Sequence, residues 1–286
     1  MVFSFLLQVL LGAFSWSYAH IKYIVLALVL SFIAQPSHAV ILLDGNNQDQ
    51  YEYIHALEGI TLKIVVETNN APFAFLEGSA SRPLGFDIDV IYALQRLLGF
   101  ELEENRFYPL STDVGFDLLD KKEADLLIGG IVLNDKRNER FDPTNIVFSS
   151  GLSYIYSKTH KEIKSPGALK GANVGVKPNS PAEYYVKSVL GGNTVLCSNS
   201  VMAFYNLVCG RLDAIVADRP SLVYFARTMP VFDLSVSDAV FDIYSGQFVF
   251  YMQKNSPYTK AFNLALKALE SNGTMYKLRK KWMTES

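Results

Sequence analysis

The sequence predicts a two-lobed α/β protein in which each lobe is built on a mostly parallel sheet. Three observations lead to this prediction. Short apolar stretches alternate with amphipathic ones, and the β-α-β-α-β order occurs twice along the chain. Two extended stretches can carry the chain from one series to the other, so two lobes would enclose a cleft, where small ligands usually bind.

The first series begins at residue 61, and its helices show the clearest signals. In the first helix apolar residues recur at near-helical intervals from Ile88 to Leu98, and Gly99 follows the last full turn. Ser111 or Thr112 opens the second helix. The expected elements are strand 61–67, helix 85–100, strand 101–108, helix 111–123 and strand 124–132.

The second series follows the same order. Its expected elements are strand 172–177, helix 180–190, strand 193–197, helix 200–210 and strand 213–218. Residues 150–163 and 243–253 are the expected crossings, and a terminal helix over 256–283 packs on the first lobe. The predicted division is 58–151 for the first part of lobe 1, 152–244 for lobe 2 and 245–286 for the C-terminal part of lobe 1.

The N-terminal segment 1–39 is apolar, with one lysine and no acid. From His20 it has a weakly basic start, an apolar centre and an end in Ser37-His38-Ala39, which predicts a secretory signal cleaved after Ala39. The preceding apolar stretch is long enough to leave membrane anchoring open. The sequence therefore predicts export of the protein.

The overall composition narrows the function classes. A net charge of −2 and the lack of a long basic run give no indication of nucleic-acid binding. Cys197 and Cys209 are too few for a disulfide scaffold or a zinc cluster, and we expect them at opposite ends of one helix, which disfavours a bridge. The sequence predicts no metal and no cofactor.

A carboxylate follows directly after a short apolar run in the second series. Residues 214–217 are small or β-branched, which indicates a strand buried on both faces, and Asp218 ends it. Ligands of open α/β sheets bind at the carboxyl ends of the strands. Taken alone, however, an acid in this position is more often part of a surface turn.

Six ordered phrases extend from Leu62 to Trp282: "APFAFLEG", "LGFDIDVIYAL", "ADLLIGGIVLNDKR", "LKGANVGVKPNSPAEYYV", "GRLDAIVAD" and "LESNGTMYKLRKKW". In this order they resemble the family 3 extracellular solute-binding proteins, the type II periplasmic binding proteins that supply polar amino acids to ABC transporters. The resemblance implies a clamshell that closes by a hinge on an amino acid or a similar zwitterion. It also implies a monomer and an inner-membrane ABC permease as partner.

The resemblance assigns the two charged groups of the ligand to opposite lobes. Arg137 matches the arginine that binds the α-carboxylate, for which a planar guanidinium offers paired N–H donors. Arg140 is the alternative, because the spacing from Arg137 to Phe148 is longer than in the family. Asp218 matches the acid that accepts hydrogen bonds from the α-ammonium.

Ser180 matches a residue that also contacts the carboxylate. It opens the helix after "VGVKPN", where a hydroxyl and free N–H groups form an anion site. Helix capping without ligand contact remains open.

The remaining matched positions line the first-lobe side. Gly130 matches directly, whereas Val132 stands where the family has Ser or Thr and could offer only its backbone. Asn70 stands where an aromatic ring is frequent, which suggests a more polar pocket. Phe73 fits the core with an edge in the pocket, and Asp87 fits either a pocket residue or a helix N-cap.

Two other function classes stay in view. A cyclohexadienyl-dehydratase-like enzyme on the same fold would need an acid in the cleft, for which Glu183, Asp87 and Asp142 are candidates. There is no G-x-S-x-G motif and no His/Asp pair with metal-ligand spacing. A receptor channel is excluded, because the stretch between the lobes contains no apolar span.

Overall fold

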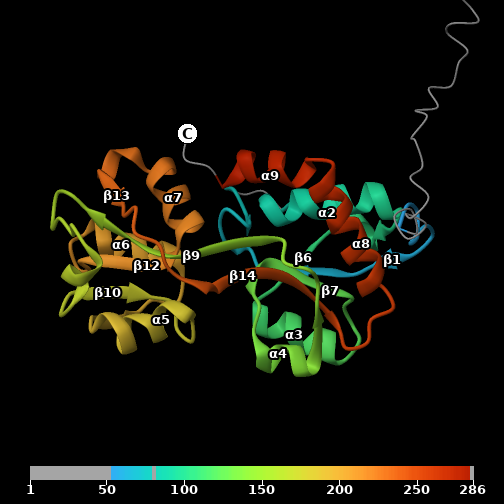
Figure 1. Cartoon of the computed structure of the whole chain (residues 1–286), viewed down its shortest axis with the longest axis horizontal. Helices are drawn as coiled ribbons and strands as arrows, with labels where there is room; N and C mark the ends of the chain where they lie inside the picture. Colours follow the sequence, from blue (N-terminus) through green and yellow to red (C-terminus); the bar gives the residue numbers. More distant parts are fainter. Residues whose placement is uncertain (1–52, 79–81, 284–286) are drawn as a thin grey trace, which may run out of the picture. The chain divides into compact units, whose positions relative to one another are not determined.

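The computed structural model describes residues 53–78 and 82–283, which include every predicted site residue. The predicted signal segment 1–39 lies outside the described residues. The two longest strands, β9 (Phe148–Ser157) and β14 (Phe241–Gln253), pair with each other at the centre of the fold (Figure 1). In the part of the chain that is described, no helix has the length and apolarity needed to cross a bilayer.

One large sheet connects the two series. Its strand order is β11-β10-β12-β9-β14-β7-β2-β6, with β13 added to β9 and β8 added to β14. Besides β9 and β14, its strands are β2 (Ile64–Val66), β6 (Tyr108–Pro109), β7 (Leu126–Val132), β8 (Phe141–Pro143), β10 (Asn173–Val176), β11 (Asn193–Leu196), β12 (Ala214–Asp218) and β13 (Leu234–Val236). Two short sheets pair β1 (Thr61–Leu62) with β5 (Glu101–Leu102) and β3 (Asn69–Asn70) with β4 (Ala74–Phe75).

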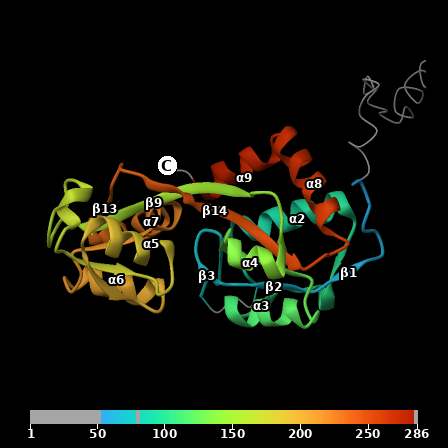
Figure 2. The same cartoon turned by 60° about the horizontal axis from the view of Figure 1, so that its bottom comes forward.

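The direction of the strands separates the two series. Strand β10 runs parallel to β11 and β12, and β2 runs parallel to β6 and β7. Strands β9 and β14 run antiparallel to β12 and β7 and to each other. The two stretches expected to be crossings are therefore the long strands that join two parallel parts, as Figure 2 shows from a second side.

Helices lie on both faces of the sheet. In Figure 1, α2, α8 and α9 lie on one side of β7 and β14, and α3 and α4 lie on the other. The helices are α2 (Phe86–Leu98), α3 (Thr112–Asp120), α4 (Asp135–Arg140), α5 (Pro181–Tyr185), α6 (Ser200–Val208), α7 (Arg219–Thr228), α8 (Thr259–Ser271) and α9 (Thr274–Trp282).

Buried apolar side chains fill the space between these layers. One cluster lies between the sheet and α2 and α8, and a second lies on the α3 side around Val65, Leu127 and Tyr251. Two further clusters flank β10 and β12, one towards α5 and one towards α6. Burial of apolar surface on both faces is the main favourable contribution to such a fold.

The first helix forms as the sequence predicts. The apolar positions Ile88, Ile91, Leu94 and Leu98 are at most 2% exposed. Gly99 adopts a left-handed conformation with φ 82°, and its N–H binds the carbonyl of Gln95 to end the helix. The predicted opening of the second helix is also confirmed, since the Ser111 side chain accepts a hydrogen bond from the Val114 N–H.

Two predicted elements are interrupted in the structure. The strand predicted over 101–108 breaks into β5, a 3₁₀ turn and β6, because Glu104 and Asn105 have positive φ angles. The prediction of a single C-terminal helix over 256–283 was also wrong. This segment divides into α8 and α9, because Gly273 has a φ angle of 76°, which a helix interior does not allow. As predicted, α8 and α9 pack against the first series, on α2.

Other differences concern the second series. The helix predicted over 180–190 is α5 followed by a π-helical turn, and α7 was not predicted at all. Cys197 directly follows β11 and Cys209 caps α6, so both positions are as expected. Both thiols are free.

Candidate functional site

Asn70 connects β3 to the middle of β7. Its Nδ2 donates to the carbonyl oxygens of Gly129 and Gly130, at 3.1 Å in each case. Because those bonds use the donors of the side-chain amide, Asn70 stabilises the strand beside it.

The Gly129–Gly130 corner needs glycine at both positions. The φ angles are 116° and 68°, which L side chains rarely adopt. A Cβ atom at Gly130 would stand 2.3 Å from Asn70 Nδ2 and 2.9 Å from the ring of Phe73. A Cβ atom at Gly129 would stand 2.3 Å from the Glu67 carbonyl oxygen. The chain is closely packed against this corner on both sides.

Phe73 belongs to the core. It is fully buried and packs its ring against Phe86, Phe148 and Phe248, with the Phe248 ring centre 4.3 Å away. Its contact with the Gly130 position places it behind the corner.

Asp87 supports the corner from the opposite side. Its Oδ2 accepts hydrogen bonds from the Gly129 and Gly130 N–H groups, at 2.9 and 2.7 Å. The N-cap alternative for Asp87 is wrong, because Gly85 holds that position and Asp87 is the second residue of α2. The residue is 1% exposed, and its Oδ1 has no hydrogen-bond partner among the described residues. Burial raises the pKa of Asp87 to about 7, against the opposing effect of the two N–H donors.

Arg137 lies on α4, directly after β7. Its Nη1 donates to the Val132 carbonyl at 3.3 Å, and its guanidinium carbon lies 4.8 Å from the centre of the Phe116 ring. Partial burial lowers the pKa of Arg137, although an arginine stays charged at neutral pH. Val132 thus contributes its backbone carbonyl.

The competing arginine is placed differently. Arg140 is exposed and forms an ion pair with Asp120 at 3.0 Å. No ion pair of Arg137 is found in the described residues, so most of its donors remain unused there. The two arginines therefore differ, because Arg140 has an ion-pair partner and Arg137 has none among the described residues.

Asp218 ends β12 and caps α7. Its Oδ2 accepts from the Ser221 N–H at 3.2 Å and from the Ser221 hydroxyl at 2.6 Å. The residue keeps part of its surface exposed, but desolvation by the surrounding protein raises the pKa of its carboxyl. Asp218 therefore combines the strand end that the sequence predicted with a helix start that it did not.

Ser180 is the N-cap of α5. Its hydroxyl donates to the Lys177 carbonyl at 2.6 Å and accepts from the Glu183 N–H at 3.3 Å. The Glu183 carboxylate accepts in return from the Asn179 N–H and pairs with Lys187. These bonds form a local cap of the helix start.

In the structure the predicted site residues form separate groups. Asn70, Phe73, Asp87 and Gly130 form one cluster around β7, and Val132 contacts Arg137 beside it. Asp218 and Ser180 each bind the start of their own helix. Within the described residues no hydrogen bond or ion pair joins Arg137 to Asp218.

One acid of this region escaped the sequence interpretation. Glu67 directly follows β2 and is 7% exposed. Its carboxylate accepts hydrogen bonds from the Asn69 N–H and from the N–H and hydroxyl of Thr112 at the start of α3. An acid after an apolar strand was the signal used for Asp218, and the same signal identifies Glu67.

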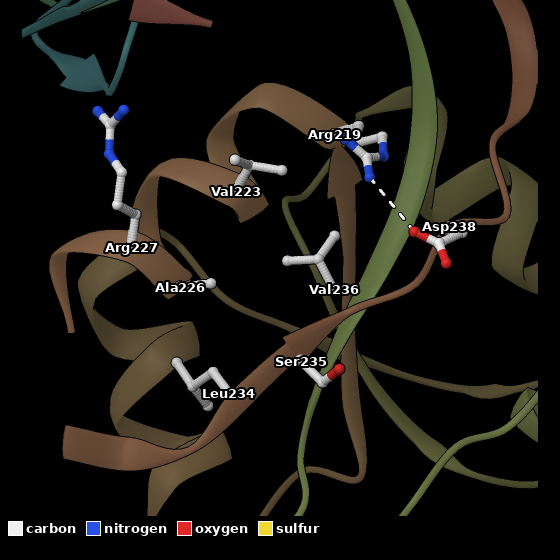
Figure 3. Close-up of a pocket in the computed structure, with 8 residues that line it drawn as sticks. All are labelled: Arg219, Val223, Ala226, Arg227, Leu234, Ser235, Val236 and Asp238. Atoms are coloured by element: carbon white, nitrogen blue, oxygen red, sulfur yellow. Dashed lines mark ion pairs between the residues drawn. The ribbon is translucent and has the colours of Figure 1, made fainter. Parts of the chain in front are cut away.

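Two pockets are lined by neighbours of these residues: Arg219, which follows Asp218, lines one, and Phe148, which packs against Phe73, lines the other. One has a volume of about 310 Å³ and lies between α7 and β13; Figure 3 shows Arg219 paired with Asp238 at one end and Arg227 at the other. A second, of about 350 Å³, is lined by Ile146, Phe148, Ser149, Glu270 and Arg279. In the described part of the chain, no group of three or more His, Cys, Asp or Glu residues could hold a metal ion.

Comparison with known proteins gives a consistent result. The model of the bacterial extracellular solute-binding proteins, family 3, matches residues 62–285. The arginine-binding extracellular protein ArtP of Bacillus subtilis is 30% identical over 219 residues, which cover 74% of this chain and 82% of ArtP. The L-cystine-binding protein TcyJ of Escherichia coli is 27% identical over 225 residues, 78% of this chain and 82% of TcyJ.

Solved structures show the same fold. An ancestral amino acid-binding protein, described as a precursor of cyclohexadienyl dehydratase, superposes with a TM-score of 0.67 at 27% identity. The match covers 78% of this chain and 96% of that protein. The predicted type II periplasmic-binding-protein fold, with two parallel parts joined by two crossing strands, is therefore confirmed.

Proposed function

Because the chain belongs to the bacterial extracellular solute-binding proteins, family 3, we propose that it captures an amino acid for import by an ABC transporter. The names of the relatives support an amino acid as the ligand class, and they refer to binding proteins. The proposal includes a periplasmic location, an inner-membrane permease as partner, and action as a monomer without catalysis.

The observation that carries the site proposal is that most guanidinium donors of Arg137 have no partner among the described residues. A half-buried guanidinium with a single described hydrogen bond to protein has donors left for a carboxylate. Asp218 supplies the opposite charge in the second series. Both described bonds to Asp218 reach Oδ2, so Oδ1 is the atom that a ligand ammonium would contact.

Closure follows from this placement of charges. Arg137 follows β7 in one parallel part, and Asp218 ends β12 in the other, with β9 and β14 between them. A ligand that contacts both groups binds the closed arrangement more tightly than the open one and shifts the population towards it. The lobe limits 58–151, 152–244 and 245–286 belong to this proposal.

A thermal-shift screen tests the function. The protein without residues 1–39 would be melted with each standard L-amino acid and with L-cystine. A ligand at about 100 times its Kd stabilises by about 2.7 kcal/mol, which raises Tm by about 5–10 °C for a chain of this size. Failure of every amino acid to shift the transition would contradict the proposal.

Matched arginine variants test the site. Arg137→Lys removes the paired donors but keeps the charge, and Arg140→Lys makes the same change at the competing position. Loss of one side of a buried charge pair costs about 2–5 kcal/mol, so we expect Arg137→Ala to abolish measurable binding and Arg137→Lys to weaken it. Titration calorimetry with the ligand found in the screen should show wild-type affinity for Arg140→Lys. The reverse order would assign the carboxylate to Arg140.

The dehydratase alternative needs an acid that can reach a substrate. Glu183 pairs with Lys187 and caps α5, and Asp142 pairs with Lys254. Asp87 is enclosed, with Oδ2 bound to backbone. These engagements favour binding without catalysis. Formation of an aromatic product from a cyclohexadienyl precursor would favour the enzyme instead.

A further inference from the structure

The Asp87 carboxylate is buried beside the Gly129–Gly130 corner of the proposed site, and it accepts two hydrogen bonds there. Its Oδ2 accepts from two consecutive backbone N–H groups, those of Gly129 and Gly130, 42 and 43 residues along the chain. The carbonyl oxygens of the same two residues accept from Asn70 on the other side. The corner is thus held through its donors by Asp87 and through its acceptors by Asn70.

Such a corner requires external support. Both glycines have positive φ angles, and in β7 their N–H groups point to a side chain instead of to a neighbouring strand. A buried N–H group left without an acceptor destabilises the folded protein. A carboxylate that accepts two such bonds removes both costs at once and fixes the direction of the corner.

We propose that Asp87 is a positioning residue for ligand binding: it holds the Gly129–Gly130 corner through both N–H groups and so positions the two carbonyl oxygens that bind Asn70. The proposal rests on the proposed function, because the Gly129–Gly130 corner matters for binding only if the ligand binds beside it. Asp87 acts through the corner and does not itself contact the ligand.

The surroundings of Asp87 make the support sensitive to its proton. From β7 the carboxyl faces the two N–H groups, and from the segment before β4 the Phe73 carbonyl binds the Asp87 N–H. On α2 itself Asp89 is bound by Lys281 and Trp282 of α9. No charged group of α2, β4, β7, α8 or α9 within the described residues contributes to the pKa of Asp87.

Two variants separate the oxygen from the charge. Asp87→Asn keeps an oxygen that can accept both N–H bonds and loses the titrating proton. Asp87→Leu keeps the approximate size and removes the acceptor. Asp89→Asn is the matched control, because it makes the same change two residues along the same helix, at a carboxylate that binds α9 instead of the corner.

The first measurement needs no ligand. Amide hydrogen exchange in the segments 69–73 and 126–132 would be compared at equal pH in the full set of variants. We expect faster exchange there in Asp87→Leu and wild-type exchange in Asp89→Asn. In the wild type, opening of the corner exposes a carboxyl with an ordinary pKa of 3.8, so the opening equilibrium should fall by up to about tenfold for each unit by which the pH is lowered from about 7 towards 4. This pH dependence should disappear in Asp87→Asn.

The second measurement is the affinity for the amino acid that gives the largest shift in the thermal screen. We expect Asp87→Leu to lose about tenfold or more and Asp87→Asn to stay within about threefold of the wild type. Unchanged exchange at the corner in Asp87→Leu would overturn the proposal whether or not an amino acid binds. Altered exchange with unchanged affinity would also overturn it, whereas a screen without any ligand would contradict the proposed function and leave the exchange result to decide the role of Asp87.

Discussion

Replacing Gly130 by alanine tests how closely the corner is packed. The φ angle of 68° places an alanine in the left-handed region, which costs about 1–2 kcal/mol. The new Cβ atom would stand 2.3 Å from Asn70 Nδ2, so the amide has to move and lose its two hydrogen bonds. At about 1 kcal/mol for each bond, the total loss of unfolding free energy is about 3–4 kcal/mol.

Gly171 is the matched control for this prediction. Its φ angle of 73° is close to that of Gly130, but a Cβ atom there would meet nothing within 4 Å. Gly171→Ala should therefore cost only the backbone strain, about 1–2 kcal/mol. Equilibrium unfolding in urea measures both losses on the same protein.

The difference between the two variants isolates the contact with Asn70. Adding Asn70→Ala to Gly130→Ala should restore part of the loss, because the crowded amide is gone, and the double variant should be less destabilised than the sum of the single changes. Equal losses for Gly130→Ala and Gly171→Ala would refute the reasoning, since the close approach to Asn70 would then carry no energetic weight.

Three further predictions follow from individual side chains. The pKa of Asp87 is about 7 in the folded protein against an ordinary 3.8, so protonation of Asp87 contributes about 4 kcal/mol to the free energy of unfolding below about pH 4. This contribution is lost as the pH rises through 7. Urea unfolding at several pH values should show the fall in the wild type and a smaller one in Asp87→Asn. Asp218→Asn should weaken ligand binding by about 2–5 kcal/mol in calorimetry, while the Tm without ligand stays close to wild type, because asparagine also caps α7. A thiol reagent should label the exposed Cys209 quickly and Cys197 only on unfolding, since Cys197 is 3% exposed and burial raises the pKa of its thiol; equal labelling rates would contradict the packing around β11.

The sequence predicts the helices best where apolar spacing and end signals agree. In α2 the buried face and the Gly99 end both follow from one pattern. The pattern fails where a single φ angle decides, as at Gly273, because apolar spacing continues across the break between α8 and α9. Helix periodicity records which face is buried and does not record whether the backbone stays helical.

Helix α7 shows a second limit, which concerns the meaning of proline. From the sequence alone, Asp218 followed by Arg219 and Pro220 fits a surface turn after the strand. In the structure Pro220 lies in the first turn of α7, where its missing N–H would be unpaired in any case and its fixed φ angle suits the helix. Asp218 therefore ends β12 and caps α7, Arg219 and Pro220 begin the helix, and the local sequence does not separate a turn from a helix start.

The candidate site shows a third limit, which concerns distance along the chain. The partner of Asp87 lies more than 40 residues away, and only the fold brings the Gly129 and Gly130 N–H groups to its carboxylate. From the sequence alone, a carboxylate near a helix start is best explained as an N-cap, since that partner is always near. The N-cap alternative failed at Asp87 because a tertiary acceptor role competes with the local one and leaves no local pattern.

Ser180 and Asp218 both cap helices, yet their remaining capacity differs. The Ser180 hydroxyl has one proton, and it is donated to the Lys177 carbonyl at 2.6 Å, so the hydroxyl has no proton left for a ligand carboxylate in this arrangement. The carboxylate of Asp218 uses one oxygen for both Ser221 donors and retains a second oxygen with two lone pairs. The bond to the Lys177 carbonyl therefore competes with ligand contact at Ser180, whereas capping is compatible with ligand contact at Asp218. This difference follows from the chemistry of one hydroxyl and one carboxylate, and it makes the second-series half of the proposed site depend on Asp218.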